Sequence, residues 1–164
     1  MFKESLVDDD YFETIVNTYA NMLLRIAYQN LRNKNEAEDV VQDTFLQYIK
    51  NQKKFESEEH LKAWLIRITI NACKNKNKLA YLRWEVPIEG LDFAFTREEE
   101  KIMSELSRLD AKYKNVLYLY YYEEFSLKEI GVILNKSVST IGSWLQRGRK
   151  KLKIELERKN SSGG

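Results

Sequence analysis

The sequence of 164 residues contains one cysteine and one histidine, and this scarcity excludes several classes of protein. Cys73 has no second cysteine for an intramolecular disulfide, and with His60 alone it cannot supply the ligands of a zinc site. A glycine-rich phosphate-binding loop and metal-binding motifs are also missing. Because Cys73 and His60 form no supported nucleophile–base pair, we expect a protein that is not an enzyme and uses no metal or other cofactor.

Long apolar runs are missing as well. No run of about 18 apolar residues occurs, so the sequence contains no candidate membrane span. The acidic start, MFKESLVDDDYFE, does not resemble a signal peptide. Strand-like alternation and internal repeats are absent, whereas helical periodicity recurs along the chain. We therefore expect an all-α protein located in the cytoplasm.

The small net charge of +2 conceals strong alternation along the chain. Residues 1–60 carry a net charge of −5, and residues 61–84 carry +6 without one acidic side chain. The same order then repeats, with −5 over residues 85–125 and +6 over residues 126–164. Two separate basic blocks indicate two contacts with nucleic acid, although charge blocks are often only solvated faces.

The second basic block has the pattern of a helix-turn-helix. Ser126 begins a capping box with the glutamate three residues later, in which each side chain satisfies a free amide at the helix start. Gly131 allows a second helix to approach closely, and Asn135 tolerates the left-handed conformation that ends a helix. Ser137 is then placed to cap the second helix.

This second helix carries the side chains of a DNA-recognition helix. Its apolar stripe, which includes Ile141 and Leu145, is expected to face the core. The outward and flanking residues are Thr140, Ser143, Trp144, Gln146, Arg147, Arg149, Lys150 and Lys151. A recognition helix places its first residues on base edges in the major groove, and its cations pair with phosphates. The alternative is an ordinary two-helix corner with a basic solvated face.

Two amphipathic helices are predicted in the first fifty residues. Apolar residues from Phe12 to Leu31 repeat in steps of three and four, which predicts a long helix after the acidic run 8–10. Asn35 and Glu38 resemble a capping box that starts a second helix. Its predicted apolar stripe is Ala37, Val40, Val41, Thr44, Phe45, Tyr48 and Ile49, and its polar face carries Glu38, Asp39, Gln42, Asp43 and Gln47. That face is either simply solvated or a docking surface for a basic partner.

The first basic block follows a polar loop with one aromatic residue, Phe55. Ser57 is expected to cap a third helix, whose outward residues include Lys62, Arg67, Asn71, Lys74, Lys76 and Lys78. Cations and amides beside an aromatic loop suit single-stranded or melted DNA, because bases stack on rings and phosphates pair with cations. On these residues alone the simpler interpretation is favoured, in which Phe55 closes the edge of the core and the cations are solvated.

Residues 81–96 contain the only proline, Pro87, and no helical stripe, so we interpret them as a flexible linker. The sequence thus predicts two small helical domains, residues 1–80 and 97–159, and a disordered tail, residues 160–164. Two helices are expected before the helix-turn-helix. One starts with Thr96 and Glu99 and turns Ile102, Met103 and Leu106 inward; the other is capped by Asp110 and turns Tyr113, Val116, Leu117, Tyr120 and Tyr121 inward.

The chain resembles the extracytoplasmic-function sigma factors of bacterial RNA polymerase. Three segments carry the resemblance, in order: NEAEDVVQDTF at 35–45, FESEEHLKAWLIRITINACKN at 55–75, and LYLYYYEEFSLKEIGVILNKSVSTIGSWLQRGRKKLK at 117–153. The resemblance extends over roughly residues 10–157. It implies a sigma factor with two helical domains, the second a helix-turn-helix, that binds core polymerase and promoter DNA.

The resemblance also implies roles for particular residues. Asp39, Gln42 and Asp43 would meet the clamp helices of the largest polymerase subunit. The loop and helix with Phe55, Arg67, Asn71 and Lys74 would recognise and melt the −10 element, with one base flipped into a pocket formed partly by the loop. The last helix would read the −35 element through Thr140, Ser143, Trp144, Arg147, Arg149 and Lys150. An anti-sigma factor is a further implied partner.

Two positions depart from the family pattern. Family members often carry basic residues where this chain has Gly142 and Trp144, so the promoter sequence does not transfer. A second hypothesis is a stand-alone helix-turn-helix regulator that binds a palindromic site as a dimer and does not use core polymerase. The acid-free basic block at 61–84 argues against that regulator, because a dimerisation helix needs no such row of cations.

Overall fold

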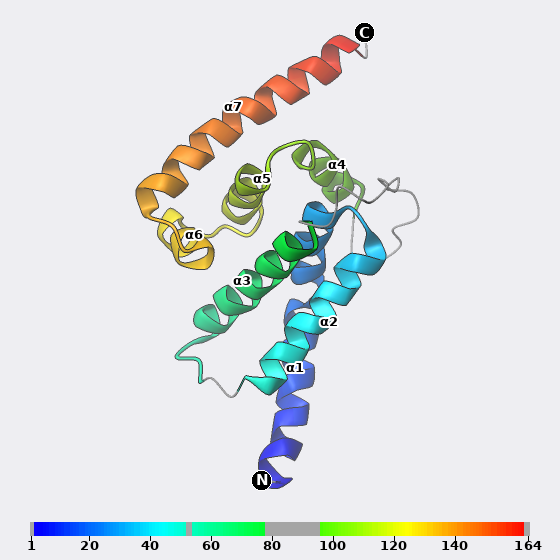
Figure 1. The fold of residues 1–164 in the computed structure, drawn as a ribbon, viewed down its shortest axis with the longest axis vertical. Helices are drawn as coiled ribbons and strands as arrows, with labels where there is room; N and C mark the ends of the chain where they lie inside the picture. The colour runs from blue at the N-terminus through cyan, green and yellow to red at the C-terminus, as the bar shows by residue number, and fades with distance from the viewer. Residues whose placement is uncertain (1, 52–53, 78–95, 163–164) are drawn as a thin grey trace. The chain divides into compact units, whose positions relative to one another are not determined.

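The computed structural model describes residues 2–51, 54–77 and 96–162, and all regular elements in these ranges are helical (Figure 1). Their order is α1 (Phe2–Leu31), α2 (Lys34–Lys50), α3 (Glu58–Asn77), α4 (Arg97–Leu106), α5 (Ala111–Leu117), the π-helical turn η2 (Tyr118–Tyr122), α6 (Leu127–Leu134) and α7 (Val138–Ser162). The chain divides into two compact units, Met1–Arg83 and Trp84–Gly164. The expected all-α, two-domain architecture is confirmed. The linker predicted at 81–96 lies outside the described residues except for Thr96 and remains a prediction.

The first unit is a bundle in which α1, α2 and α3 each pack against the other two (Figure 1). Its fully buried apolar side chains include Leu23, Ile26, Val40, Leu65 and Ile66. Two buried hydroxyl groups interrupt this apolar core, because the Oγ1 atoms of Thr44 and Thr69 lie 3.2 Å apart. Thr44 also donates to the backbone carbonyl of Val40 at 2.9 Å. The pair therefore joins α2 to α3 without leaving Thr44 unsatisfied.

The ends of the first two helices differ from the predicted ones. Helix α1 begins at Phe2 rather than after residues 8–10, because acidic residues are compatible with the first turns of a helix. At its other end Arg32 adopts a left-handed conformation, with φ of 54°. Asn33 follows at once and accepts the amide of Glu36 at 3.0 Å. The cap of α2 is therefore Asn33, and the predicted Asn35–Glu38 box is wrong.

The predicted apolar stripe of α2 is correct as far as Tyr48 and wrong at Ile49, whose side chain is 55% exposed. Residues four apart on an α-helix differ by about 40° in direction. The row that contains Val41 and Phe45 thus turns steadily away from the core and reaches solvent at Ile49. On α3 the side chains of Leu61, Trp64 and Leu65 are buried.

In the second unit α5, α6 and α4 pack on α7, and α6 also contacts η2. The fully buried side chains include Val116, Leu119, Ile130, Ile133 and Ile141. Gly148 permits a close approach in this core, since a Cβ there would lie 3.2 Å from Cδ1 of Leu117. The predicted inward positions Ile102 and Met103, and the predicted cap residue Glu99, have side chains outside the described residues.

The π-helical turn explains an error in the predicted core. A π turn contains more residues than an α turn, so side chains after Leu117 rotate away from the α-helical pattern. Tyr118 and Leu119 are buried, Tyr120 is half-buried, and Tyr121 is 53% exposed, although Tyr120 and Tyr121 were both expected inside. Asp110 does occupy the N-cap of α5, but its side chain makes no capping hydrogen bond.

The helix-turn-helix has the predicted local chemistry. Ser126 and Glu129 form the capping box, with backbone-to-side-chain distances of 3.0 and 3.1 Å. Asn135 ends α6 in the left-handed conformation, and the Oγ of Ser137 accepts the amide of Thr140 at 3.1 Å. A Cβ at Gly131 would lie 2.7 Å from the carbonyl oxygen of Lys136. The closest approach to Gly131 is thus made by the turn, and the second helix also approaches, with the nitrogen of Val138 and Cγ1 of Ile141 at 3.8 and 3.9 Å from that Cβ position.

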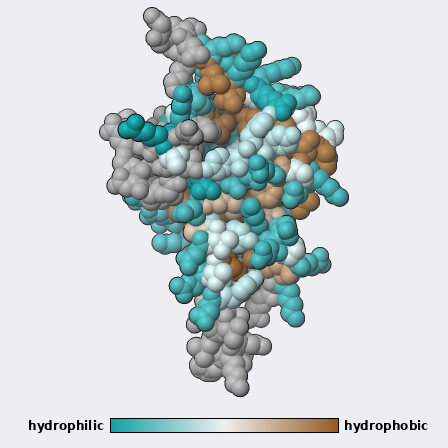
Figure 2. Space-filling model, turned by 180° about the vertical axis from the view of Figure 1, so that it is seen from behind, coloured by the Kyte–Doolittle hydropathy of each residue, from teal (hydrophilic) through white to brown (hydrophobic). Residues whose placement is uncertain are grey.

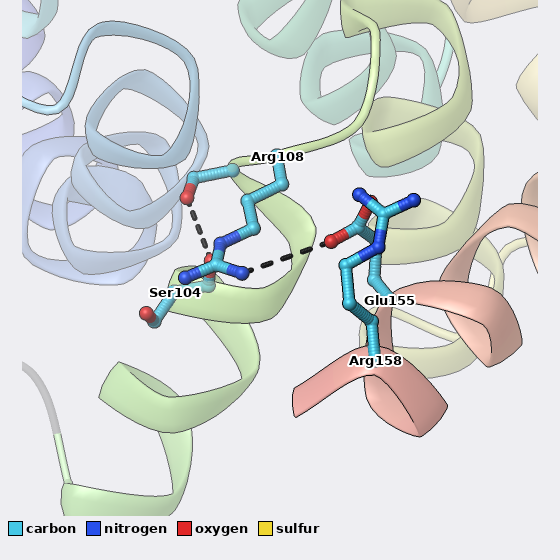
Figure 3. A network of polar contacts seen from close by, with 5 residues as sticks. Ser104, Arg108, Glu155 and Arg158 are labelled. Atoms are coloured by element: carbon cyan, nitrogen blue, oxygen red, sulfur yellow. Dashed lines mark hydrogen bonds and ion pairs between the residues drawn. The ribbon is translucent and has the colours of Figure 1, made fainter. Parts of the chain in front are cut away.

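Helix α7 continues to Ser162, so residues 160–162 are helical, although a disordered tail was predicted from residue 160. A small ionic network lies beside this last part of the helix (Figure 3). Arg108, from the turn after α4, and Arg158 both lie 3.7 Å from carboxylate oxygens of Glu155. Both arginines are largely exposed, so we expect the network to orient side chains more than to stabilise the unit.

Candidate nucleic-acid interface

The polar face of α2 is exposed and combines acidic, amide and apolar side chains. Asp39, Gln42 and Asp43 all point to solvent, as predicted. The same surface carries Leu46, 49% exposed, together with the exposed Ile49. Exposed apolar side chains beside carboxylates are typical of a protein-docking surface, whereas a merely solvated face needs none. Hydrophobic residues outside α2 are also exposed, and Figure 2 shows such patches among hydrophilic residues on one face of the molecule.

Phe55 lies in an aromatic cluster at the start of α3. Its ring stacks on Tyr48 with 6.1 Å between centroids, and it meets Trp64 edge-on at 5.4 Å. His60 makes a further edge contact at 5.3 Å. These contacts fix the position of the half-buried Phe55 ring, and the ring closes the edge of the core.

The same ring also borders an open cavity of about 480 Å³. The cavity is lined by Tyr11, Tyr48, Lys54, Phe55, Ser57, Glu58 and Leu61. Its walls thus combine three aromatic rings with hydroxyl, carboxylate and ammonium groups, which are the groups that stack on and hydrogen-bond to a nucleobase. Tyr11 comes from α1 and Tyr48 from α2, so three segments that are distant in sequence build this site.

The three predicted DNA residues of α3 lie on one strip of the helix. Arg67, Asn71 and Lys74 are four and three residues apart, which places them on one face. Asn71 and Lys74 are exposed, and Arg67 is half-buried. Lys74 is 13 residues beyond Leu61, or about 20 Å along the helix axis. The strip therefore leads away from the cavity. The four residues predicted for the −10 element, Phe55 and these three, do not lie together at one point.

Acidic side chains surround the first turn of α3 and affect Tyr19 of α1. The pKa of Tyr19 is raised above its ordinary value of 10.0, chiefly by burial and then by the negative charge of Glu58. Tyr11 and Glu59 raise the pKa further. Tyr19 is therefore neutral near pH 7, and the phenol adds no charge near the cavity.

On α7, three of the predicted DNA residues lie on the side opposite the buried stripe. Arg147 and Lys150 are exposed and Ser143 is half-buried, and all three point away from Ile141 and Leu145. Thr140 is half-buried near the helix start, where its hydroxyl accepts from Ser137 at 2.9 Å. Hydroxyls at the start of the helix and cations further along match the order in which a recognition helix meets bases and phosphates.

Trp144 and Arg149 lie instead on the two flanks of α7, because residues five apart differ by about 140° in direction. The half-buried Trp144 ring has Lys112 and Lys136 near its face, at 5.6 and 6.0 Å from the centroid. Arg149 donates from Nε to the hydroxyl of Tyr121, and its guanidinium lies 5.3 Å from that ring. The six predicted residues thus form an outward face with two flanks.

Other candidate sites are less informative. A hollow of about 250 Å³ beside the Glu155 network is lined by Arg108, Leu109, Asp110, Lys151, Ile154, Glu155 and Arg158, and contains no aromatic ring. Within the described ranges no group of three or more His, Cys, Asp or Glu side chains is placed to hold a metal ion. The described helices are all too short or too polar to cross a membrane.

Sequence reasoning missed several residues of these surfaces. Tyr11 and Tyr48 of the cavity were assigned to neither DNA contact, and only the packing of α1 and α2 on α3 brings them there. Lys112 of α5 reaches Trp144 through the same kind of long-range packing. Leu46 was detectable, since it interrupts an otherwise polar face, whereas Ile49 was assigned to the core.

Two sequence families match the chain, one in each unit. Sigma-70 region 2 matches residues 15–83, which contain the acidic face of α2, the strip of α3 and the lining of the aromatic cavity except Tyr11. Sigma-70, region 4 matches residues 99–152, which contain the helix-turn-helix. The two matches occur in the order of the two units.

Individual relatives match over nearly the whole chain. The ECF RNA polymerase sigma factor SigW of Bacillus subtilis (strain 168) is 34% identical over 169 residues, covering 91% of this chain and 90% of SigW. The RNA polymerase sigma-E factor of Streptomyces coelicolor is 28% identical over 152 residues, covering 88% of this chain and 85% of the sigma-E factor.

Solved structures share the fold. The sigma factor RpoE of Bartonella quintana, in complex with the anti-sigma factor NepR, superposes with a TM-score of 0.73 at 24% identity, covering 89% of this chain and 96% of RpoE. CnrH, in complex with the cytosolic domain of CnrY, superposes with a TM-score of 0.69 at 23% identity, covering 92% of this chain and 90% of CnrH. These findings do not favour the stand-alone regulator, and the chain belongs to the extracytoplasmic-function family of RNA polymerase sigma factors, alternative sigma factors that direct transcription.

Proposed function

We propose that the exposed face of α2 is the surface with which this sigma factor binds core RNA polymerase. Asp39, Gln42 and Asp43 would meet a basic surface on the clamp helices of the largest subunit, and Leu46 and Ile49 would add apolar contact. The single observation that carries this proposal is the exposure of two large apolar side chains within an acidic face. Charges would then guide the encounter and buried apolar area would prolong the complex.

The aromatic cavity would receive a base from the melted −10 element. Removing a base from the stack costs a few kcal/mol, which stacking and hydrogen bonds in a pocket must offset. Phe55 is suited to this role because three neighbouring rings fix its position and one side borders the cavity. Arg67, Asn71 and Lys74 would hold the strand that leads away from the flipped base.

Helix α7 would read the −35 element in the major groove. Thr140, Ser143 and Arg147 would face base edges, and Lys150 and Arg149 would bind phosphates. Trp144 would lie on the other flank of the helix, beside Lys112 and Lys136. The protein would act without catalytic chemistry of its own, in the cytoplasm and at the nucleoid when bound to polymerase. The sigma factor RpoE was solved in complex with the anti-sigma factor NepR, and we extend such a partner to this chain.

The decisive experiment is co-elution of the purified full chain with core RNA polymerase at moderate salt. We expect the double variant Asp39→Arg/Asp43→Arg to lose at least tenfold in affinity, because two carboxylates would become cations opposite a basic surface. The matched control is Asp10→Arg/Glu13→Arg, which reverses two exposed charges on α1 of the same unit and should bind as the wild type does. Equal binding by all three proteins would show that α2 is not the docking surface.

A further inference from the structure

Trp144 gathers cations from two other parts of the second unit. Lys112 comes from α5 and Lys136 from the turn before α7, and both ammonium groups lie within about 6 Å of the indole centroid, the range of a cation–π contact. The ring is half-buried and both lysines are exposed. An exposed lysine side chain ordinarily samples many rotamers. The Trp144 ring therefore restricts Lys112 and Lys136 to rotamers that keep both ammonium groups beside it.

The arrangement continues along the same flank of α7. Lys112 also lies 5.1 Å from the ring of Tyr113, and Lys151 lies 5.5 Å from that ring. Lys151 is seven residues after Trp144, about two helical turns, so both project from one side of the helix. The result is a row of alternating cations and rings, here called the lysine–aromatic ribbon, made of Lys136, Trp144, Lys112, Tyr113 and Lys151.

The ribbon lies between the buried stripe of α7 and its outward face. Trp144 is about 100° from Ser143, on the outward side, and about 100° from the buried Leu145. A helix with its side chains is about 10–12 Å across and the major groove about 12 Å wide. When the outward face of such a helix enters the groove, its flanks come next to the two phosphate backbones. The flank with the ribbon offers three lysines there, and the other flank offers Arg149, held by Tyr121.

We propose that Trp144 is a positioning residue for the DNA backbone: its ring places the ammonium groups of Lys112 and Lys136 at the edge of the major groove, where they bind phosphates. This inference rests on the proposed −35 role of α7. It assigns DNA contacts to Lys112 and Lys136, one of which lies outside the helix-turn-helix altogether. It also gives Trp144 a role through its lysines instead of through direct contact with bases.

The test uses the full chain and a fluorescent duplex of random sequence, with affinity measured over a series of salt concentrations. Each phosphate contact contributes about 0.9 to the slope of log affinity against log salt. Lys112→Ala/Lys136→Ala should therefore lower the slope by up to about 1.8. Trp144→Ala should lower it in the same direction although it removes no charge, and Trp144→Phe should restore most of the slope. Lys101→Ala, an exposed lysine of α4, is the control for loss of charge and should leave the slope almost unchanged.

A double-variant comparison separates the two roles of the ring. If Trp144 acts through the lysines, Trp144→Ala has no further effect in the Lys112→Ala/Lys136→Ala protein. A loss of affinity that persists in that background, with an unchanged slope, would overturn the proposal and show direct contact with bases. The lysine variant removes only exposed side chains, so it tests the phosphate contacts without removing the half-buried ring. A wild-type chain without salt-dependent duplex binding would contradict the −35 role itself.

Discussion

The two surfaces that we propose for DNA binding in this sigma factor use helices in different ways. Helix α3 is buried over much of its circumference, and the site at its start depends on a cavity completed by α1 and α2. Helix α7 buries only a narrow stripe, and Arg147, Arg149 and Lys150 are all exposed. The first surface is therefore a product of tertiary packing, whereas the outward face of the second comes from one helix and its cap, and only its flanks use residues of other elements. A pocket suits a base removed from the stack, and an exposed helix suits an intact groove.

The largest effect is expected from a cavity in the core of the first unit. Leu65 is completely buried, so Leu65→Ala should lower the free energy of unfolding by about 2–5 kcal/mol. Hydrogen exchange should show lost protection in α1, α2 and α3 and unchanged protection in α5, α6 and α7. Leu46→Ala, at an exposed position of the same unit, is the matched control. Equal loss of protection in both units would show that the two surfaces do not depend on separate cores.

A smaller effect should separate the two modes of DNA binding. Phe55→Ala removes a stacking ring, which typically costs about 1–3 kcal/mol per base, so affinity for a single-stranded oligonucleotide should fall roughly tenfold to a hundredfold. The measurement uses the complex of this chain with core polymerase. Arg147→Ala is the reciprocal variant and should weaken duplex binding while leaving the single strand unaffected. If both variants weaken both ligands equally, the distinction between pocket and groove is wrong.

The same contrast explains what could be predicted from the sequence. The capping box at Ser126 and the left-handed Asn135 involve neighbours in sequence, and both were found. The acidic face of α2 was found because helical periodicity assigns faces directly, but Ile49 was misplaced by the drift of one row. The cavity needed Tyr11 from another helix, and no local pattern identifies that contact. Tyr121 was misplaced because a π turn changes the periodicity without a sequence signal that we recognised.

The local cap of the helix-turn-helix gives the next prediction. Ser126→Ala removes the hydroxyl that accepts the amide of Glu129, so the free energy of unfolding of the second unit should fall by about 1 kcal/mol. Thermal unfolding followed by circular dichroism measures the change. Ser139→Ala, an exposed serine in the first turn of α7, serves as the control and should unfold like the wild type. An unchanged Ser126→Ala protein would mean that packing of α6, more than its cap, fixes the start of the helix.

The smallest expected effect is an alkaline sensitivity located in the first unit. The pKa of Tyr19 is raised by burial first and by Glu58 second, so the folded chain holds the phenol proton more tightly than the unfolded chain. This contribution to stability is complete below about pH 10 and is lost as the pH rises through the folded-state value. Tyr19→Phe should therefore flatten the fall of the urea midpoint above about pH 10. Glu58→Gln should flatten it only in part, because burial remains; if it removes the fall completely, the charge of Glu58 and not burial controls Tyr19.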